Sequence, residues 1–151
     1  VDSKIKNYHW LDFVSGMLNS YDHGHDTAIL IDEKNNVLEG PGFNIFSVDK
    51  TGLNTPDHGV LEGITRQTVI DLAKELDQSI NIKPISIEKL KSSDELFATS
   101  TAGGIMPITK INGKAVGSGA PGKITRELHK IYWDKHSDPD WSLSVENILI
   151  E

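Results

Sequence analysis

The sequence predicts an α+β fold, in which a mostly antiparallel β-sheet is flanked by helices. Several short apolar segments follow one another with connections of only a few residues, which favours antiparallel pairing because a parallel crossover needs a dozen residues or more. Other segments carry apolar residues at helical spacing. The length of 151 residues suits one domain with a buried core.

The first predicted element is a helix. Apolar side chains recur at helical spacing near the start of the chain, and His23 with Gly24 follows where such a helix would stop. We expect this amphipathic helix to pack on the sheet. Its apolar residues are Trp10, Phe13, Val14, Met17, Leu18 and Tyr21.

A run of short strands is predicted next. The segments 27–32 (TAILID), 37–40 (VLEG) and 43–49 (FNIFSVD) are rich in apolar residues, and the turn signal Asn35-Asn36 separates the first two. We expect consecutive antiparallel pairing here, because the connections are too short for a parallel crossover.

The middle of the chain predicts a second helix and then a strand. The helix spans about 65–76 and is started by Thr65, with Gly59 and Gly63 before it. The alternating segment 80–87 (INIKPISI) predicts a strand, in which Pro84 suggests an edge or a bulge. The apolar face of the helix consists of Ile64, Val69, Leu72, Ala73 and Leu76.

The last third predicts a strand, a hairpin and a helix. The strand is 95–100 (ELFATS), and Asn112-Gly113 is the strongest short hairpin signal in the chain. Apolar residues at helical spacing place a final helix over roughly 122–136. No element is assigned to the tail, residues 137–151.

Composition limits the classes of partner. The 22 acidic and 15 basic side chains give a formal net charge of -7, which disfavours nucleic acid as a partner. The absence of cysteine excludes disulfides and thiolate metal sites and is typical of an intracellular, cytoplasmic protein. The longest aliphatic runs have four residues, far fewer than the ~20 that span a bilayer, so no membrane partner is expected.

Two glycine-bearing turns could bind an anion. The turn GVLEGITR precedes a predicted helix, and STAGGIMP follows a predicted strand. Free N–H groups at a helix start, together with threonine hydroxyls and glycines that allow close approach, suit a phosphate. The alternative is that each turn is only a cap or a tight connection.

Lys6 and Glu39 are the candidates for chemistry. Lys6 lies between Ile5 and an aromatic-rich run, and a lysine in apolar surroundings has a lowered pKa that suits a nucleophile or Schiff-base former. Glu39 ends a predicted strand, where its carboxylate could accept a hydrogen bond from a protonated ring nitrogen. The alternatives are a solvated terminal lysine and an exposed strand-end glutamate.

Two other patterns are interpreted as loops. Gly117, Gly119 and Gly122 match the dinucleotide-binding spacing, but no βαβ unit surrounds them. His23 and His25 lie in a turn without a third metal ligand at a recognisable spacing. We therefore expect neither a dinucleotide site nor a metal site.

Four segments are informative because of the order in which they occur: KNYHWLD, LEGPGFNIFSV, TPDHGVLEGITRQTV and ELFATSTAGGIMPIT. Together they resemble the fold-type IV, class IV aminotransferases, the pyridoxal-phosphate family of branched-chain and D-amino-acid aminotransferases. The residues of these segments are most similar to those of the (R)-selective amine transaminases. The resemblance covers about residues 5–136 and implies pyridoxal 5'-phosphate as cofactor.

The resemblance implies a role for each matching position. Lys6 would form the Schiff base with the cofactor and shuttle the proton, and Glu39 would keep the pyridine nitrogen protonated. Leu61 would pack on the ring. The phosphate would be bound by Ile64, Thr65 and Thr101, and Ser100 would also bind the cofactor. The substrate side would be lined by Trp10, Ala102 and Gly103.

The resemblance also implies the domain and its reaction. Residues 1–136 would be the large cofactor domain, a sheet closing toward a pseudo-barrel, without the family's small N-terminal domain, because only five residues precede Lys6. A homodimer would transfer an amino group between an amino acid or amine and a 2-oxo acid. Alternatives are an aminodeoxychorismate-lyase-like enzyme, or a non-catalytic fragment that folds and dimerises.

Overall fold

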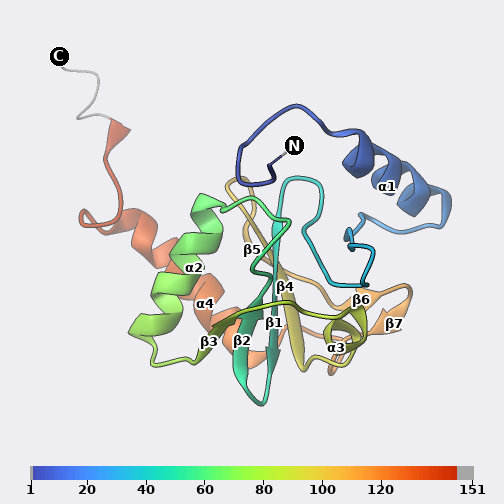
Figure 1. Ribbon diagram of the computed structural model, residues 1–151. Helices are drawn as coiled ribbons and strands as arrows, with labels where there is room; N and C mark the ends of the chain where they lie inside the picture. Colours follow the sequence, from blue (N-terminus) through green and yellow to red (C-terminus); the bar gives the residue numbers. More distant parts are fainter. Residues whose placement is uncertain (1, 146–151) are drawn as a thin grey trace.

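A five-stranded sheet forms the centre of the computed structural model, which describes residues 2–145 (Figure 1). The strand order is β3-β2-β1-β4-β5, and a separate two-stranded ribbon pairs β6 with β7. The strands are β1 (Asn44–Asp49), β2 (Gly52–Thr55), β3 (Ile80–Ile82), β4 (Glu95–Ser100), β5 (Gly104–Pro107), β6 (Lys110–Ile111) and β7 (Lys114–Ala115). The helices are α1 (Leu11–Asp22), α2 (Ile64–Glu75), α3 (Ile87–Lys91), α4 (Lys123–Asp134) and the 3₁₀-helix η1 (Lys135–Ser137).

The pairing confirms the predicted α+β class with a mostly antiparallel sheet. β1 pairs antiparallel with both β2 and β4, and β4 pairs antiparallel with β5. β3 is the exception, because it runs parallel to β2 at the edge of the sheet. The chain between them contains α2, which supplies the long crossover that a parallel pair requires.

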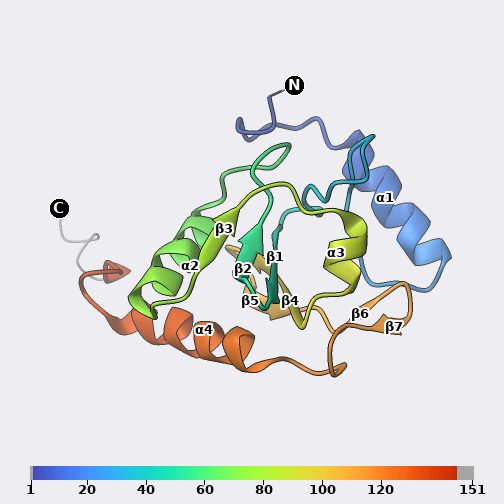
Figure 2. The same cartoon turned by 60° about the horizontal axis from the view of Figure 1, so that its bottom comes forward.

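Side-chain alternation divides the core into two layers. Phe46 and Phe97 face α2 and α4, and their rings stack with centroids 5.1 Å apart. Ile45 and Leu96 point to the other side, where they pack with Leu90 of α3. Figure 2 shows α2 and α4 on one side of the sheet and α3 with the β6–β7 ribbon on the other. Both faces of the central strands are therefore buried.

The expectation that the first helix packs on the sheet is wrong. α1 forms at the predicted place, but it stands apart from the strands (Figures 1 and 2). It contacts the segment around Ala28 and Leu30, which Gly16 approaches closely. An apolar stripe at positions 11, 14, 18 and 21 faces outward, with Leu11 78% exposed.

The segments 27–32 and 37–40 pair as predicted but do not form regular strands. Their antiparallel contacts are backbone hydrogen bonds between Leu30 and residues 38 and 39, with an isolated bridge from Ile31 to Val37. The turn between them lies at Asn35, whose positive φ of 61° confirms the predicted turn signal. This pairing brings Glu39 to the start of β1, where Asn44 donates a hydrogen bond to it.

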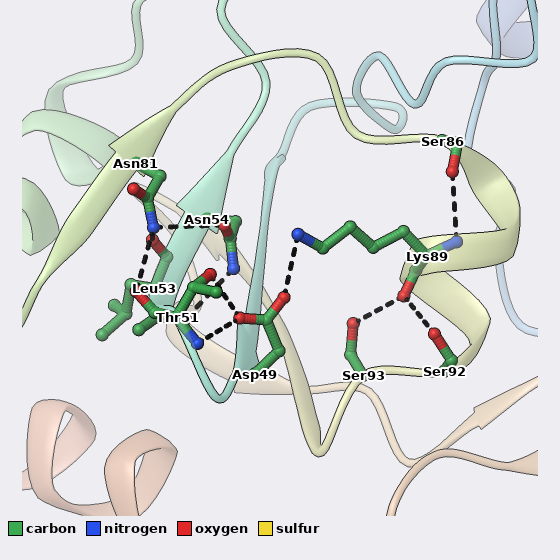
Figure 3. A network of polar contacts seen from close by, with 10 residues as sticks. Asp49, Thr51, Leu53, Asn54, Asn81, Ser86, Lys89, Ser92 and Ser93 are labelled. Atoms are coloured by element: carbon green, nitrogen blue, oxygen red, sulfur yellow. Dashed lines mark hydrogen bonds and ion pairs between the residues drawn. The ribbon is translucent and has the colours of Figure 1, made fainter.

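The predicted strand 80–87 is wrong in its second half. β3 ends at Ile82, and Ser86 caps α3 by accepting a hydrogen bond from the Lys89 amide at 3.2 Å. In Figure 3 the Lys89 side chain reaches from α3 to Asp49 at the end of β1, 3.1 Å from its carboxylate. Hydrogen bonds from Thr51 and this ammonium lower the pKa of Asp49.

The predicted hairpin, final helix and loops are confirmed. Asn112 and Gly113 connect β6 with β7, both at positive φ. Gly117 and Gly119 lie in the loop before α4, and Gly122 is the N-cap of that helix. Among the helices described, none is both long and apolar enough to cross a bilayer.

Candidate active site

A cavity of about 330 Å³ lies where four segments meet. These are the N-terminal segment, the loop before β1, the loop leading into α2 and the end of β4. All the predicted site residues line it except Ala102 and Gly103, which lie in the turn after β4. The predicted residues that it brings together are Lys6, Trp10, Glu39, Leu61, Ile64, Thr65, Ser100 and Thr101.

Glu39 provides the acidic end of the cavity. Its Oε2 atom accepts hydrogen bonds from the Leu61 amide at 3.0 Å and from Asn44 Nδ2 at 3.1 Å. Burial raises the pKa of the carboxyl, and the Leu61 hydrogen bond with the charges of Arg66 and Lys6 opposes that rise. A cationic group bound beside Glu39 would therefore stabilise its ionised form.

The start of α2 provides the other polar end. Gly63 is the N-cap and offers no side chain to cap the helix. The first-turn N–H groups of a helix have no intrahelical partner, and the helix dipole favours negative charge beside them. Thr65 is buried in this turn, whereas the Ile64 side chain is exposed, so Ile64 can contribute through its backbone.

The end of β4 adds hydroxyl groups to the same cavity. Ser100 Oγ accepts a hydrogen bond from the Gly103 amide at 3.0 Å, which folds the glycine turn onto the strand end. Thr101 follows and is exposed. Thr99 is buried, and within residues 2–145 its Oγ1 atom has no hydrogen-bond partner. An unpaired buried hydroxyl is costly unless a ligand or water pairs with it.

Lys6 lines the cavity but is not buried. The prediction of apolar surroundings for its ammonium is wrong for this chain, because Lys6 is exposed at the cavity mouth. An ion pair of 2.9 Å between Lys4 and Glu62 ties the N-terminal segment to the loop before α2. Trp10 donates from Nε1 to the Asn7 carbonyl at 2.9 Å and packs edge-on against Phe13.

Asn44 and Thr99 are site residues that the sequence did not single out. They are direct partners in the β1–β4 register, and both line the cavity. Only the strand pairing brings them together. Asn44 belongs to the segment LEGPGFN, which also contains Glu39. Its position at the start of a predicted strand was the one sequence feature that could have pointed to it.

His23 and His25 lie just after α1. His23 and His25 are exposed, and within residues 2–145 no group of three potential ligands is close enough to hold a metal ion.

Known proteins share both the sequence pattern and the fold. A sequence model of the family described as Amino-transferase class IV matches residues 1–111. The chain belongs to the class IV aminotransferase family. A Methanocaldococcus jannaschii protein, provisionally named as a branched-chain-amino-acid aminotransferase, is 36% identical over 93% of this chain and 49% of its own length. The Pseudomonas aeruginosa branched-chain-amino-acid aminotransferase is 37% identical over 74% of this chain and 36% of its own length.

Solved branched-chain amino acid aminotransferases have the same fold. The Thermobaculum terrenum enzyme in its PLP-form has a TM-score of 0.85 at 35% identity, covering 89% of this chain and 45% of that one. The Escherichia coli enzyme has a TM-score of 0.79 at 32% identity, covering 82% and 43%. The chain thus spans about half the length of these relatives or less. The narrower likeness to (R)-selective amine transaminases stays a prediction.

Proposed function

We propose that the chain is the cofactor-binding part of a pyridoxal-phosphate-dependent aminotransferase. It would move an amino group between an amino acid or amine and a 2-oxo acid. The observation that supports this most is the convergence of Lys6, Glu39 and Thr65 on one cavity. Family membership supports it too, as do neighbours solved in a pyridoxamine 5'-phosphate complex and in a PLP-form.

The cavity residues fit the chemical groups of pyridoxal phosphate. A pyridinium nitrogen needs a carboxylate partner, which Glu39 provides. A phosphate needs N–H and hydroxyl donors, which the uncapped start of α2, Thr65 and Thr101 provide. The buried Thr99 hydroxyl, which has no hydrogen-bond partner among the described residues, is a further observation that favours a polar ligand here. The cofactor, when bound, supplies an electron sink for carbon next to the amine nitrogen.

Residues at the two ends of the cavity would have different roles. Glu39 would accept the hydrogen bond from the ring nitrogen, and the positive charge there would favour its ionised form. The α2 N-terminus with Thr65 would fix the phosphate, and Leu61 would pack beside the ring. Lys6 would hold the cofactor through its side-chain amine, with the aldehyde oxygen leaving as water, and the same amine would later move the proton.

Borohydride trapping tests the proposed lysine. The chain is incubated with pyridoxal phosphate and reduced, and the attachment site is mapped by mass spectrometry. We expect one stable adduct on Lys6, and loss of that adduct and of amino transfer to a 2-oxo acid in Lys6→Ala. Lys4→Ala is the matched control, two residues away, and should keep the adduct. An adduct that survives in Lys6→Ala at the same level would refute the assignment.

We also propose that residues 1–136 form the cofactor domain and that two copies associate. The outward apolar stripe of α1, with Leu11, Val14, Leu18 and Tyr21 all exposed, supports a partner surface. A second copy is the partner that the proposed homodimer requires. The cytoplasmic location stays a prediction, which fractionation of the native cells would test.

A further inference from the structure

We propose that Asn44 is a positioning residue that holds the Glu39 carboxylate and the Leu61 peptide together as one unit. This inference rests on the proposed function for its catalytic meaning, because Glu39 is the residue that would face the cofactor ring. The hydrogen bonds and packing that support it are all made by residues of this chain, without a cofactor. Asn44 would act through Glu39 and would not touch the reacting atoms.

Three hydrogen bonds form a closed ring among these residues. Asn44 Nδ2 donates to Glu39 Oε2 at 3.1 Å and to the Leu61 carbonyl at 2.8 Å. The Leu61 amide donates back to the same Oε2 atom at 3.0 Å. A primary amide nitrogen has two N–H donors, and here each has an acceptor. The ring joins residues that are far apart in the sequence but adjacent in the cavity.

The surroundings hold Asn44 in this position. It is the first residue of β1, 5% exposed, and it pairs with Thr99 in the central part of the sheet. A Cβ atom at Gly63 would clash with Asn44 Oδ1, so only a residue without a side chain allows this packing. Gly63 has an ordinary extended backbone, with φ of -65°, so conformational freedom is not the reason for glycine here.

The three hydrogen bonds fix only one of the two carboxylate oxygens of Glu39. Both donors bind Oε2, and among the described residues no hydrogen bond is made to Oε1. The carboxylate therefore has one oxygen anchored and the other available to a ligand. Asparagine suits this role because aspartate lacks the donors, and an alkyl side chain would leave the Leu61 carbonyl without this partner.

The first test uses the unaltered chain without cofactor. The side-chain amide signals of Asn44 are followed by NMR through a pH titration, together with the Leu61 backbone amide. We expect both to shift with one common midpoint, that of the Glu39 carboxyl, and to lose this shift in Glu39→Gln. Asn44 amide signals that stay constant while the Glu39 carboxyl titrates would overturn the proposal.

The second test uses Asn44→Asp, which keeps the shape but replaces the amide donor with a titratable group. The introduced carboxyl can donate to Glu39 only while protonated, so cofactor affinity should become steeply pH-dependent. We expect binding about 10- to 100-fold weaker than wild type near pH 8, with partial recovery near pH 5. Gly63→Ala should weaken binding too, because its methyl group displaces the Asn44 amide.

Asn54→Asp is the matched control. Asn54 is fully buried on β2 and donates from Nδ2 to the Gly52 carbonyl at 3.1 Å, away from the cavity. We expect it to lose stability without the pH-dependent loss of affinity. Equal affinity profiles for wild type and Asn44→Asp would overturn the proposal. Failure of the wild type to bind pyridoxal phosphate would refute the proposed function, and the cofactor-free titration would still decide the role of Asn44.

Discussion

Ionisation of the Glu39 carboxyl is disfavoured in the ligand-free chain and would be favoured beside a bound cationic group. Burial disfavours its charge and raises its pKa, while the Leu61 amide and the charge of Arg66 favour ionisation. Arg66 is itself buried in the first part of α2 and donates to the Thr55 hydroxyl and the Pro56 carbonyl. Glu39, which we propose to bind the ring nitrogen, is thus costly to ionise until a cationic group lies beside it.

Glu39→Gln should therefore stabilise the ligand-free chain at neutral pH. A carboxyl whose folded pKa lies above its unfolded value of about 4.3 lowers stability as pH rises through that interval, and an amide removes this cost. We expect a higher urea midpoint for Glu39→Gln at pH 7 and little difference at pH 4, together with weaker cofactor binding. A lower midpoint at pH 7 would contradict this account.

His58 links two loops that lead into the cavity. Its Nδ1 lies 2.6 Å from the Asp57 carboxylate and its Nε2 lies 3.4 Å from Asp32. Hydrogen bonds to Asp57 and Asp32 raise the pKa of His58, and hydrogen bonds from Asn36 lower that of Asp32 to about 2. A protonated His58 thus connects the turn before Glu39 with the loop before Leu61.

His58→Gln should show a pH-dependent loss of stability. The contribution of His58 is fully present below its unfolded pKa of about 6.5 and is lost as pH rises through the raised folded pKa. We expect the Tm difference from wild type to be largest near pH 6 and to shrink steadily as pH rises above that value. Circular dichroism melts would measure it, with His25→Gln, in an exposed turn, as control. A difference that is constant with pH would contradict the assignment.

Much of the candidate site could be predicted from the sequence because its motifs occur in a fixed order. Lys6, Glu39 and Thr65 come together as expected. Asn44 and Thr99 could not be singled out, since their roles depend on the β1–β4 register, which no local pattern specifies. The exposure of Lys6 agrees with the alternative of a solvated terminal lysine, which the local sequence had left open.

At the level of elements, α4 is anchored to the sheet through a side chain of β4. Glu95 accepts hydrogen bonds from the Ile124 amide at 3.1 Å and, through Oε2, from the amide and hydroxyl of Thr125 at 2.7 and 2.6 Å. The N-cap Gly122 has no capping side chain, so a carboxylate distant in sequence satisfies the first turn.

Glu95→Ala should lower the free energy of unfolding by about 1–2 kcal/mol, the typical loss for a helix cap. Urea unfolding followed by tryptophan fluorescence would measure it. Glu88→Ala, which removes an exposed ion pair with Lys91, is the matched control and should cost no more than about 0.5 kcal/mol. Equal losses in the two variants would show that Glu95 does not cap α4.

Elements with strong local signals were predictable, and those that depend on packing were not. β4 has the predicted bounds, and α2 and α4 lie within a residue or two of theirs. The short helix α3 was missed, since its first residue, Ile87, ends the alternating segment 80–87 and five residues carry little helical periodicity. β2 and β5 were missed because they are four residues long and glycine-bearing, so their extended form depends on pairing with β1 and β4.

At the level of the whole molecule, α1 stands apart from the five-stranded sheet (Figures 1 and 2). Its stripe of Leu11, Val14, Leu18 and Tyr21 faces outward, next to the cavity residues Trp10 and Phe13. An association through this face would therefore border the cavity. The proposed homodimer and the site are thus expected to influence each other.

Leu18→Lys should weaken self-association by about 10-fold or more, because a charge would be buried in an apolar contact. Sedimentation velocity over a concentration series would measure the monomer–dimer equilibrium. Leu143→Lys, at an 81% exposed position outside α1, is the matched control and should leave the equilibrium unchanged. Identical behaviour of the two variants would exclude α1 as the contact surface.

The short backbone segment from Leu61 to Thr65 has a consequence for ligand selection. Its first residue is anchored to Glu39 and its last lies in the first turn of α2, so both polar ends of the cavity belong to one connected path. Four residue steps extend over at most ~14 Å. The cavity should therefore discriminate ligands by length more than by bulk. A molecule whose cationic and anionic groups are one methylene too far apart would lose one of its two contacts.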